Sequence, residues 1–205
     1  MGKFLITQSL ISSWNYLHNC YDGCEEDAYN DFIDTLNRVP SVPNEAMQNG
    51  IEFETEVYKA AAGISRPAHP KWENGINAVA TVIKGAQTQV KAQRELTIGG
   101  TNLLVYGILD ALKAGSIFDV KFSNKGFSSA DLAGKYLDSP QHSTYFFIVP
   151  EAHEFKYLVS DGDDLYTERY TPRETRPFPE IAKEFLDSLE AMNLLNVYKE
   201  KWLAL

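Results

Sequence analysis

Two aspartates and a lysine stand close together in the middle of the chain, as Asp110 and Asp119-Val120-Lys121. Side chains alternate between the two faces of a strand, so Asp119 and Lys121 share one face and Val120 points to the other. If the two segments form a hairpin, the aspartates converge, and a half-buried carboxylate pair is costly unless a cation or a hydrogen-bond donor compensates it. Two carboxylates and a backbone carbonyl suit Mg²⁺, and a lysine beside the ion can orient or deprotonate a water molecule.

The pattern of an acidic residue, any residue and a lysine is weak by itself, because a chain of this composition contains it by chance. Glu154-Phe155-Lys156 has the same pattern, and we interpret it as an ordinary amphipathic strand with a solvated ion pair. Asp119 differs because it follows Ser116-Ile117-Phe118, an apolar segment that we expect to be buried. This expected burial favours the Asp119 triplet over its rival.

A sheet is needed to hold these segments, and the hydrophobic pattern predicts one within residues 87–172. Residues 89–98 alternate loosely, Gly99-Gly100 is a hairpin signal, and residues 103–112 and 117–122 form apolar strands. A second hairpin is expected over residues 154–170. Helical periodicity predicts a helical lead-in over residues 1–86 and C-terminal helices over residues 173–205. A first helix, capped by Thr7 or Ser9, is expected to carry Leu10, Trp14 and Leu17. Further helices are expected at about 25–38, 44–62, 72–86, 139–148 and 178–202.

Helices, then a hairpin-rich sheet, then helices predict an α/β fold in which helices flank a central mixed β-sheet. The chain has 205 residues, of which 44% are hydrophobic, so we expect one domain over residues 1–205 with a core that needs no covalent staple. The apolar runs are too short for a membrane span, and the start turns polar too soon for a signal peptide. Two cysteines cannot form a disulfide framework, so we expect a cytoplasmic protein.

Four short motifs follow one another along the chain. They are Gly50/Glu54, Asp110, Asp119/Lys121 and Gln141/Tyr145. Their order resembles the PD-(D/E)XK nuclease superfamily, in particular its RecB-like and phage-exonuclease branch. In that family a helix with Gly-x-x-x-(Glu/His) precedes a strand with Asp, a strand with (Asp/Glu)-x-Lys and a helix with Gln-x-x-x-Tyr. The segment from Ser9 to Cys20 is also similar to the opening helix of that branch. The resemblance covers residues 9–145 and implies a restriction-endonuclease-like core.

The resemblance implies a metal site built from carboxylates. Asp110 and Asp119 would bind Mg²⁺ or Mn²⁺, and Val120 would lend its carbonyl oxygen. Glu54 would bind the ion directly or through a water molecule. The residue before Asp110 is Leu109, where the family often has Pro.

The resemblance also implies the catalytic roles. Asp110 and Asp119 belong to this set through the ion, and Lys121 would position the attacking water. Gln141 would orient Lys121 or a phosphate group, and Tyr145 would support its helix or touch the DNA backbone. The implied reaction is hydrolysis of a phosphodiester bond, with metal-held water attacking in line.

Cysteines distinguish this chain from some of its relatives. Certain members of the branch hold an iron–sulfur cluster on one N-terminal and three C-terminal cysteines. Cys20 matches the first, but no cysteine follows Cys24, so we expect no iron–sulfur cluster. Together with His18 these thiols are too few for a structural Zn²⁺ site, which needs four ligands.

Other polar residues near the motifs are compatible with either a structural or a functional role. His142 stands beside Gln141, and we expect it to pack in the core. Three lysines, Lys113, Lys125 and Lys135, are expected around the site. The loop over residues 123–129 could lie over a DNA backbone or be an ordinary surface loop, and the sequence leaves both open.

The function implied by the resemblance is that of a Mg²⁺-dependent deoxyribonuclease, with an exonuclease of phage or prophage recombination as the expected subtype. Its partner would be DNA, a homo-oligomer and a recombination partner protein would fit this subtype, and no membrane is expected. Two alternatives stay open. One is a structure-specific or restriction-like endonuclease, and the other is a non-catalytic nucleic-acid- or protein-binding module on the same scaffold.

The net negative charge of the chain has to be compatible with a DNA partner. Its formal net charge is −9, which argues against a simple electrostatic nucleic-acid binder and by itself favours a small-molecule or protein partner. Several carboxylates are assigned to the metal site, however, where bound cations would offset them. We therefore expect metal-free DNA binding to be weak and to fall steeply with salt.

Overall fold

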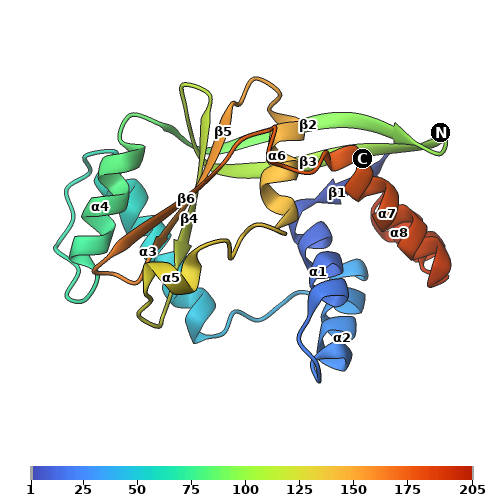
Figure 1. The fold of residues 1–205 in the computed structure, drawn as a ribbon, viewed down its shortest axis with the longest axis horizontal. Helices are drawn as coiled ribbons and strands as arrows, with labels where there is room; N and C mark the ends of the chain where they lie inside the picture. The colour runs from blue at the N-terminus through green and yellow to red at the C-terminus, as the bar shows by residue number, and fades with distance from the viewer. Residues whose placement is uncertain (1, 205) are drawn as a thin grey trace.

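The computed structural model describes residues 2–204 and contains one mixed sheet with helices on both faces (Figure 1). The strands are β1 (Phe4–Thr7), β2 (Gln87–Ile98), β3 (Thr101–Lys113), β4 (Ser116–Phe122), β5 (Glu154–Ser160) and β6 (Leu165–Tyr170). The helices are α1 (Gln8–Asn19), α2 (Glu25–Leu36), α3 (Glu45–Ala61), α4 (Glu73–Ile83), α5 (Ser129–Leu132), α6 (Pro140–Ile148), α7 (Phe178–Ala191) and α8 (Leu195–Lys201). This is the α/β architecture that the sequence predicts. None of the helices described has the length and apolar character needed to cross a membrane.

The long strand β3 organises the sheet. β2 pairs antiparallel along most of its length, after a turn at Gly99-Gly100. The other edge of β3 is shared, because β1 pairs in parallel with residues 103–106 and β4 pairs antiparallel with residues 111–113. Beyond this short contact β4 leaves β3 and pairs in parallel with β5, which pairs antiparallel with β6. Residues 107–110 of β3 therefore lie between the end of β1 and the start of the β4 pairing.

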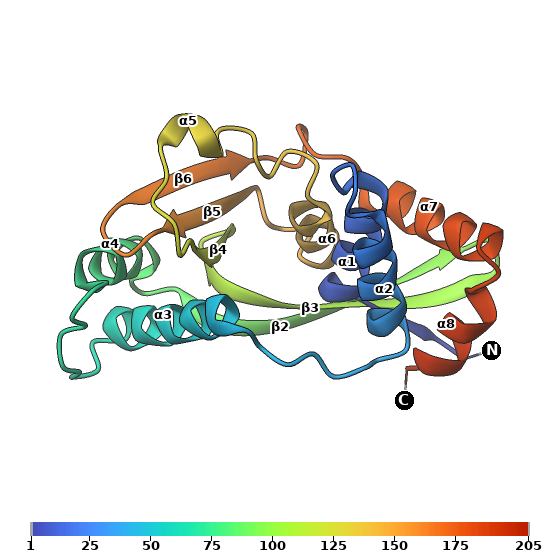
Figure 2. The ribbon, with the colours of Figure 1, turned by 90° about the horizontal axis from the view of Figure 1, so that it is seen from below.

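Two hydrophobic cores lie on opposite faces of the sheet, as the alternation along β4 shows. Ile117 belongs to the larger core, which is built with α1, α2, α6, α7 and α8, whereas Phe118 and Val120 belong to the smaller core with α3 and α4. Both views show α3 and α4 at one end of the molecule, α7 and α8 at the other, and α6 between them (Figures 1 and 2). The chain termini meet at the second end, where the Leu5 amide donates to the Trp202 carbonyl at 2.7 Å.

Local chemistry explains where the helices that frame the site begin. Thr7 caps α1, Asn44 caps α3 at 2.9 Å from the Met47 amide, and Ser139 caps α6 just before Pro140 at its first position. Oxygen side chains at such positions accept backbone N–H groups that have no partner within the helix, and Pro fits the first turn because it lacks an N–H group. These caps fix where Glu54 and Gln141 fall on their helices.

The structure differs from the sequence predictions in three places. Residues 4–7 form β1, a strand too short for periodicity to detect. The C-terminal helix expected over 178–202 is interrupted between α7 and α8, where Asn193 has φ 58°. Asn tolerates this left-handed conformation, which ends helices. The short helix α5 follows the loop expected over residues 123–129 and has no counterpart among the predicted elements.

Gly107 provides a test of how α6 packs on the sheet. A Cβ atom at this position would lie 2.5 Å from Cε1 of Tyr145 and 3.0 Å from Cδ1 of Ile148. Both side chains are packed in the larger core. Gly107→Ala should therefore lower the free energy of unfolding by about 1–3 kcal/mol in urea denaturation. Gly50→Ala is the matched control, since no atom lies within 4 Å of its added Cβ in the middle of α3. That variant should be stabilised by about 0.5–1 kcal/mol, and a Gly107→Ala variant as stable as the parent would contradict the packing described.

Candidate active site

Asp110 and Asp119 meet where β4 separates from β3. The backbone pairing of β3 with β4 has ended at this point, and the side chain of Asp110 supplies a hydrogen bond between the two strands. Its Oδ2 accepts the Val120 amide at 2.8 Å. Asp119 is 3% exposed and lies on the face of the larger core. Burial, and then the charges of Asp119 and Glu54, raise the pKa of Asp110 to about 8. The structure thus brings the two predicted aspartates into one buried, negatively charged site.

Lys121 and Gln141 both reach Asp119, from β4 and from α6. Nζ of Lys121 is 2.8 Å from Oδ2 of Asp119, and Nε2 of Gln141 donates to Oδ1. Burial lowers the pKa of Lys121, but Asp119 raises it more, so the net shift is upward. The sequence predicted that Gln141 would orient Lys121 or a phosphate group. Its observed contact is instead with Asp119, the partner of Lys121.

Tyr145 lies four residues after Gln141 on α6 and is 5% exposed. Its hydroxyl donates to the Ile108 carbonyl at 2.8 Å, within the stretch of β3 that neither β1 nor β4 pairs. Its ring packs parallel to that of Phe155, with centroids 5.8 Å apart. Tyr145 therefore ties α6 to the strand that carries Asp110. The predicted support of its own helix agrees with this position, whereas a contact with DNA stays a prediction.

Glu54 approaches the two aspartates from α3 on the other side. Its Oε1 accepts a hydrogen bond from the Tyr58 hydroxyl and one from Nε2 of Gln89 at 3.0 Å. The Gln89 amide also donates to the Tyr58 hydroxyl at 2.8 Å. Burial raises the pKa of Tyr58, and the charge of Asp110 raises it further. Glu54 is therefore held beside the cluster by two residues that the sequence analysis did not assign to the site.

The chemistry of these donors fits a hard divalent cation. Oδ2 of Asp119 is buried, and its close partner among the described residues is the Lys121 ammonium at 2.8 Å, an ion pair without hydrogen-bond direction. Carboxylate oxygens are the ligands that Mg²⁺ and Mn²⁺ prefer. Over residues 2–204, no three His, Cys, Asp or Glu side chains are grouped so that they could hold a metal ion as they stand. The metal ligands Asp110, Asp119, Glu54 and the Val120 carbonyl remain predictions.

The site residues missed from sequence differ in how visible they were. Tyr58 follows Glu54 by one helical turn, a spacing at which side chains meet, but its aromatic character suggested the core instead. Gln89 is an unremarkable polar residue in a strand, and only the tertiary structure brings it to Glu54.

Most of the other polar residues considered from the sequence make structural contacts. Cys20 and Cys24 are free thiols, and Nε2 of His18 is 3.0 Å from the Ser188 hydroxyl. Lys113 donates to the Lys84 carbonyl at 2.7 Å, at the turn between β3 and β4. The rival triplet forms an ion pair on β5, with Nζ of Lys156 2.7 Å from Oε1 of Glu154, and this pair is only partly exposed.

His142 packs in the core, as predicted, and anchors α6. It is 2% exposed, and its Nδ1 is 3.0 Å from the Tyr157 hydroxyl. Its ring stacks on Tyr170 with centroids 4.3 Å apart. Burial lowers the pKa of His142 to about 4.

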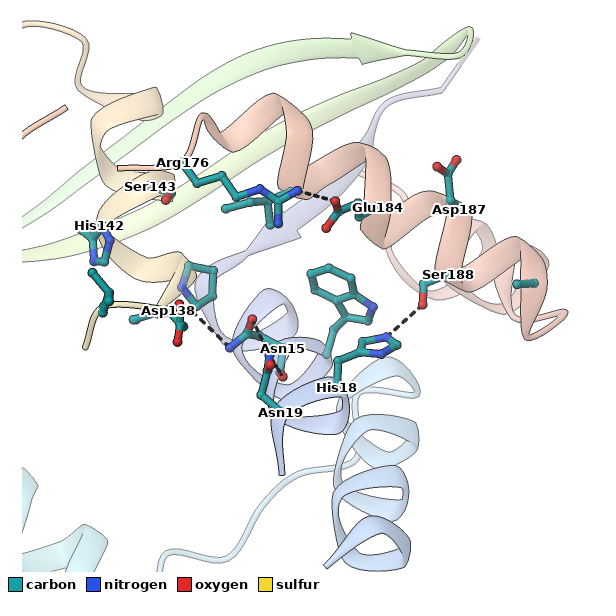
Figure 3. Close-up of a pocket in the computed structure, with 16 residues that line it drawn as sticks. Asn15, His18, Asn19, Asp138, His142, Ser143, Arg176, Glu184, Asp187 and Ser188 are labelled. Carbon is teal, nitrogen blue, oxygen red and sulfur yellow. Dashed lines mark hydrogen bonds and ion pairs between the residues drawn. The ribbon is translucent and has the colours of Figure 1, made fainter. Parts of the chain in front are cut away.

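A cavity of about 650 Å³ lies between α1, α6 and α7 (Figure 3). It is lined by α1, residues 137–140, α6 and α7. Its charged residues are the carboxylates Asp138, Glu184 and Asp187 and the guanidinium of Arg176, which is itself paired with Glu184. The four residues Glu54, Asp110, Asp119 and Lys121 are not among those that line this cavity.

Comparisons with known proteins show the fold. No family model matches the sequence, and no curated protein sequence matches it significantly. Among solved structures, LHK-Exo in complex with dAMP is similar, with a TM-score of 0.54, 16% identity, and coverage of 96% of this chain and 92% of that chain. SSO0001 is also similar, with a TM-score of 0.52, 14% identity, and coverage of 94% of this chain and 78% of that chain. This chain therefore shares its fold over nearly its whole length with both proteins.

His142 should make the protein sensitive to acid. The pKa of His142 in the folded protein is lowered below the ordinary value of 6.5. Between these two pKa values the unfolded chain binds a proton that the folded chain does not bind. Stability is then lost as pH falls from 6.5 towards 4, by up to about 3 kcal/mol. In urea denaturation at about pH 7 and pH 4.5, His142→Gln should lose less stability between the two pH values than the parent. His153→Gln, at an exposed position, should keep the parent's loss, and equal losses in all three proteins would contradict the prediction.

Proposed function

We propose that this chain is a Mg²⁺- or Mn²⁺-dependent deoxyribonuclease that hydrolyses phosphodiester bonds of DNA. The observation that supports this most directly is the convergence of the Asp110 and Asp119 carboxylates, where the buried Oδ2 of Asp119 has the Lys121 ammonium at 2.8 Å as its close partner. Three carboxylates, those of Asp110, Asp119 and Glu54, beside one lysine are costly in a stable fold unless a further cation offsets their charge. The order of the four motifs and the fold shared with LHK-Exo, solved in complex with dAMP, support the same conclusion.

Each residue of the cluster has a part in this chemistry. A divalent cation bound by Asp110, Asp119, the Val120 carbonyl and Glu54 would supply positive charge that stabilises a phosphoryl-transfer transition state. Lys121, a charged donor fixed by Asp119, positions the attacking water and the scissile phosphate.

Two α6 residues orient this cluster without reacting. Gln141 fixes the rotamer of Asp119. Tyr145 holds β3 next to Asp110. Rigid placement of this kind matters, since reacting groups must stay close to the productive geometry.

The proposal includes the subtype. An exonuclease of phage or prophage recombination agrees with the motif order and with the exonuclease neighbour. A homo-oligomer around DNA, a recombination partner protein and a cytoplasmic location belong to the same proposal and rest on the family resemblance.

Lys121→Ala and Asp119→Ala should each reduce metal-dependent DNA degradation by about 100-fold or more, because each removes a charge that acts on the reacting phosphate. The chain offers a matched control in Lys156→Ala, which removes the lysine of the Glu154-Phe155-Lys156 triplet on the neighbouring strand. That variant should keep near-parental activity. Degradation of a labelled duplex with Mg²⁺ measures all three, and circular dichroism confirms folding. Undiminished cleavage by both site variants would refute the assignment.

The subtype is tested by the form of the DNA. An exonuclease requires a strand end, so linear duplex should be degraded while covalently closed circular DNA stays intact. Cutting of the circle would identify an endonuclease. Binding without any cleavage, in Mg²⁺ and in Mn²⁺, would identify a non-catalytic module.

A further inference from the structure

Gln89 has an unusual backbone conformation for its place in a strand. Its φ is 53°, in the left-handed region that residues other than glycine rarely adopt. β2 pairs with β3 through Thr88 and Ala111 and through Val90 and Leu109, on either side of Gln89 and Asp110. The strained residue therefore lies directly across from the first aspartate of the site.

The strand β3 is irregular at the same point. Leu109 belongs to the larger core and Ala111 to the smaller one, although residues two apart in a regular strand share a face. The alternation therefore slips at Asp110, whose Oδ2 accepts the Val120 amide of β4. The irregularities of β2 and β3 coincide, and both lie at the carboxylate cluster.

The side chain of Gln89 uses this conformation to reach α3. Its amide nitrogen donates to Oε1 of Glu54 at 3.0 Å and to the Tyr58 hydroxyl at 2.8 Å, while that hydroxyl donates to the same Oε1. The three groups form a closed triangle between a helix and a strand. Backbone strain that persists at such a place is typical of functional positions.

The triangle leaves the second oxygen of Glu54 available. Oε1 accepts two hydrogen bonds, whereas none of the side chains and backbone groups that the structure describes donates a hydrogen bond to Oε2. Two donors on one oxygen restrict the rotation of the carboxylate and fix where the other oxygen points. Partners of this kind commonly orient the ligands of a metal site.

We propose that Gln89 and Tyr58 are positioning residues that hold Glu54 by one carboxylate oxygen and present the other to a divalent cation shared with Asp110 and Asp119. This inference rests on the proposed cation site and adds two residues that no motif identifies. It also gives the strain at Gln89 a reason, since a relaxed strand would aim the amide elsewhere.

The decisive variant is Gln89→Gly. Glycine adopts a positive φ without strain, so this change removes the amide while the fold and the thermal midpoint are kept or improved. Mn²⁺ binding to the full chain without DNA, followed by isothermal titration calorimetry, should weaken by about 10-fold or more. Tyr58→Phe should weaken it in the same direction. Gln93→Ala, at an exposed glutamine farther along β2, is the matched control and should bind Mn²⁺ like the parent.

A double-mutant cycle separates positioning from a general structural effect. If Gln89 acts through Glu54, Gln89→Gly should weaken Mn²⁺ binding in the parent and cause little further change in a Glu54→Gln background. An equal loss in both backgrounds, or unchanged binding by Gln89→Gly, would overturn the positioning role alone. If the parent itself bound no Mn²⁺ at millimolar concentration, the proposed cation site would fail, and this inference with it.

Discussion

The site depends on one constraint in the sheet, which is that β1 and β4 share an edge of β3 without meeting. Residues 107–110 are left without a strand partner on that edge, and polar backbone groups inside a protein must find partners elsewhere. Asp110 accepts the Val120 amide, and Tyr145 donates to the Ile108 carbonyl. Side chains thus supply hydrogen bonds at the split, and this brings a carboxylate and α6 to the place where Asp119 emerges from β4.

The same split explains why α6 is anchored so firmly. Gln141 contacts Asp119 from one face of this helix, while Tyr145 and His142 fix it to β3 and to the aromatic cluster over β5 and β6. Because Gly107 has no Cβ atom, the Tyr145 ring can approach the strand closely. A buried polar network of this kind specifies one arrangement, because each group left without its partner would be costly. Rigidity at α6 is therefore a condition for the orientation of Asp119.

Much of this arrangement could be read from the sequence, and the reasons for the failures are physical. The β2–β3 hairpin, the α/β class and the convergence of Asp110 with Asp119 follow from alternation and from a glycine turn, which are local signals. β1 is too short to show a period, and Asn193 interrupts the C-terminal helix through a conformation that no pattern announces. Gln89 was missed for a different reason, since its role arises only from contacts between segments far apart in the chain.

The acidic composition and a nucleic-acid partner are compatible because of where the charges lie. Three acidic residues, Glu25, Glu26 and Asp27, fill the first turn of α2, where the helix dipole favours them. That helix packs on α1 and α8, which carry none of the proposed ligands. Exposed charges are screened beyond a Debye length of about 8–10 Å at physiological salt. The net charge of the whole chain therefore says little about the electrostatic potential at one site. The carboxylates that matter are those at the split in the sheet, where a divalent cation would offset the local negative charge. A negatively charged protein can then hold a negatively charged polymer at one point, provided that the ion is present.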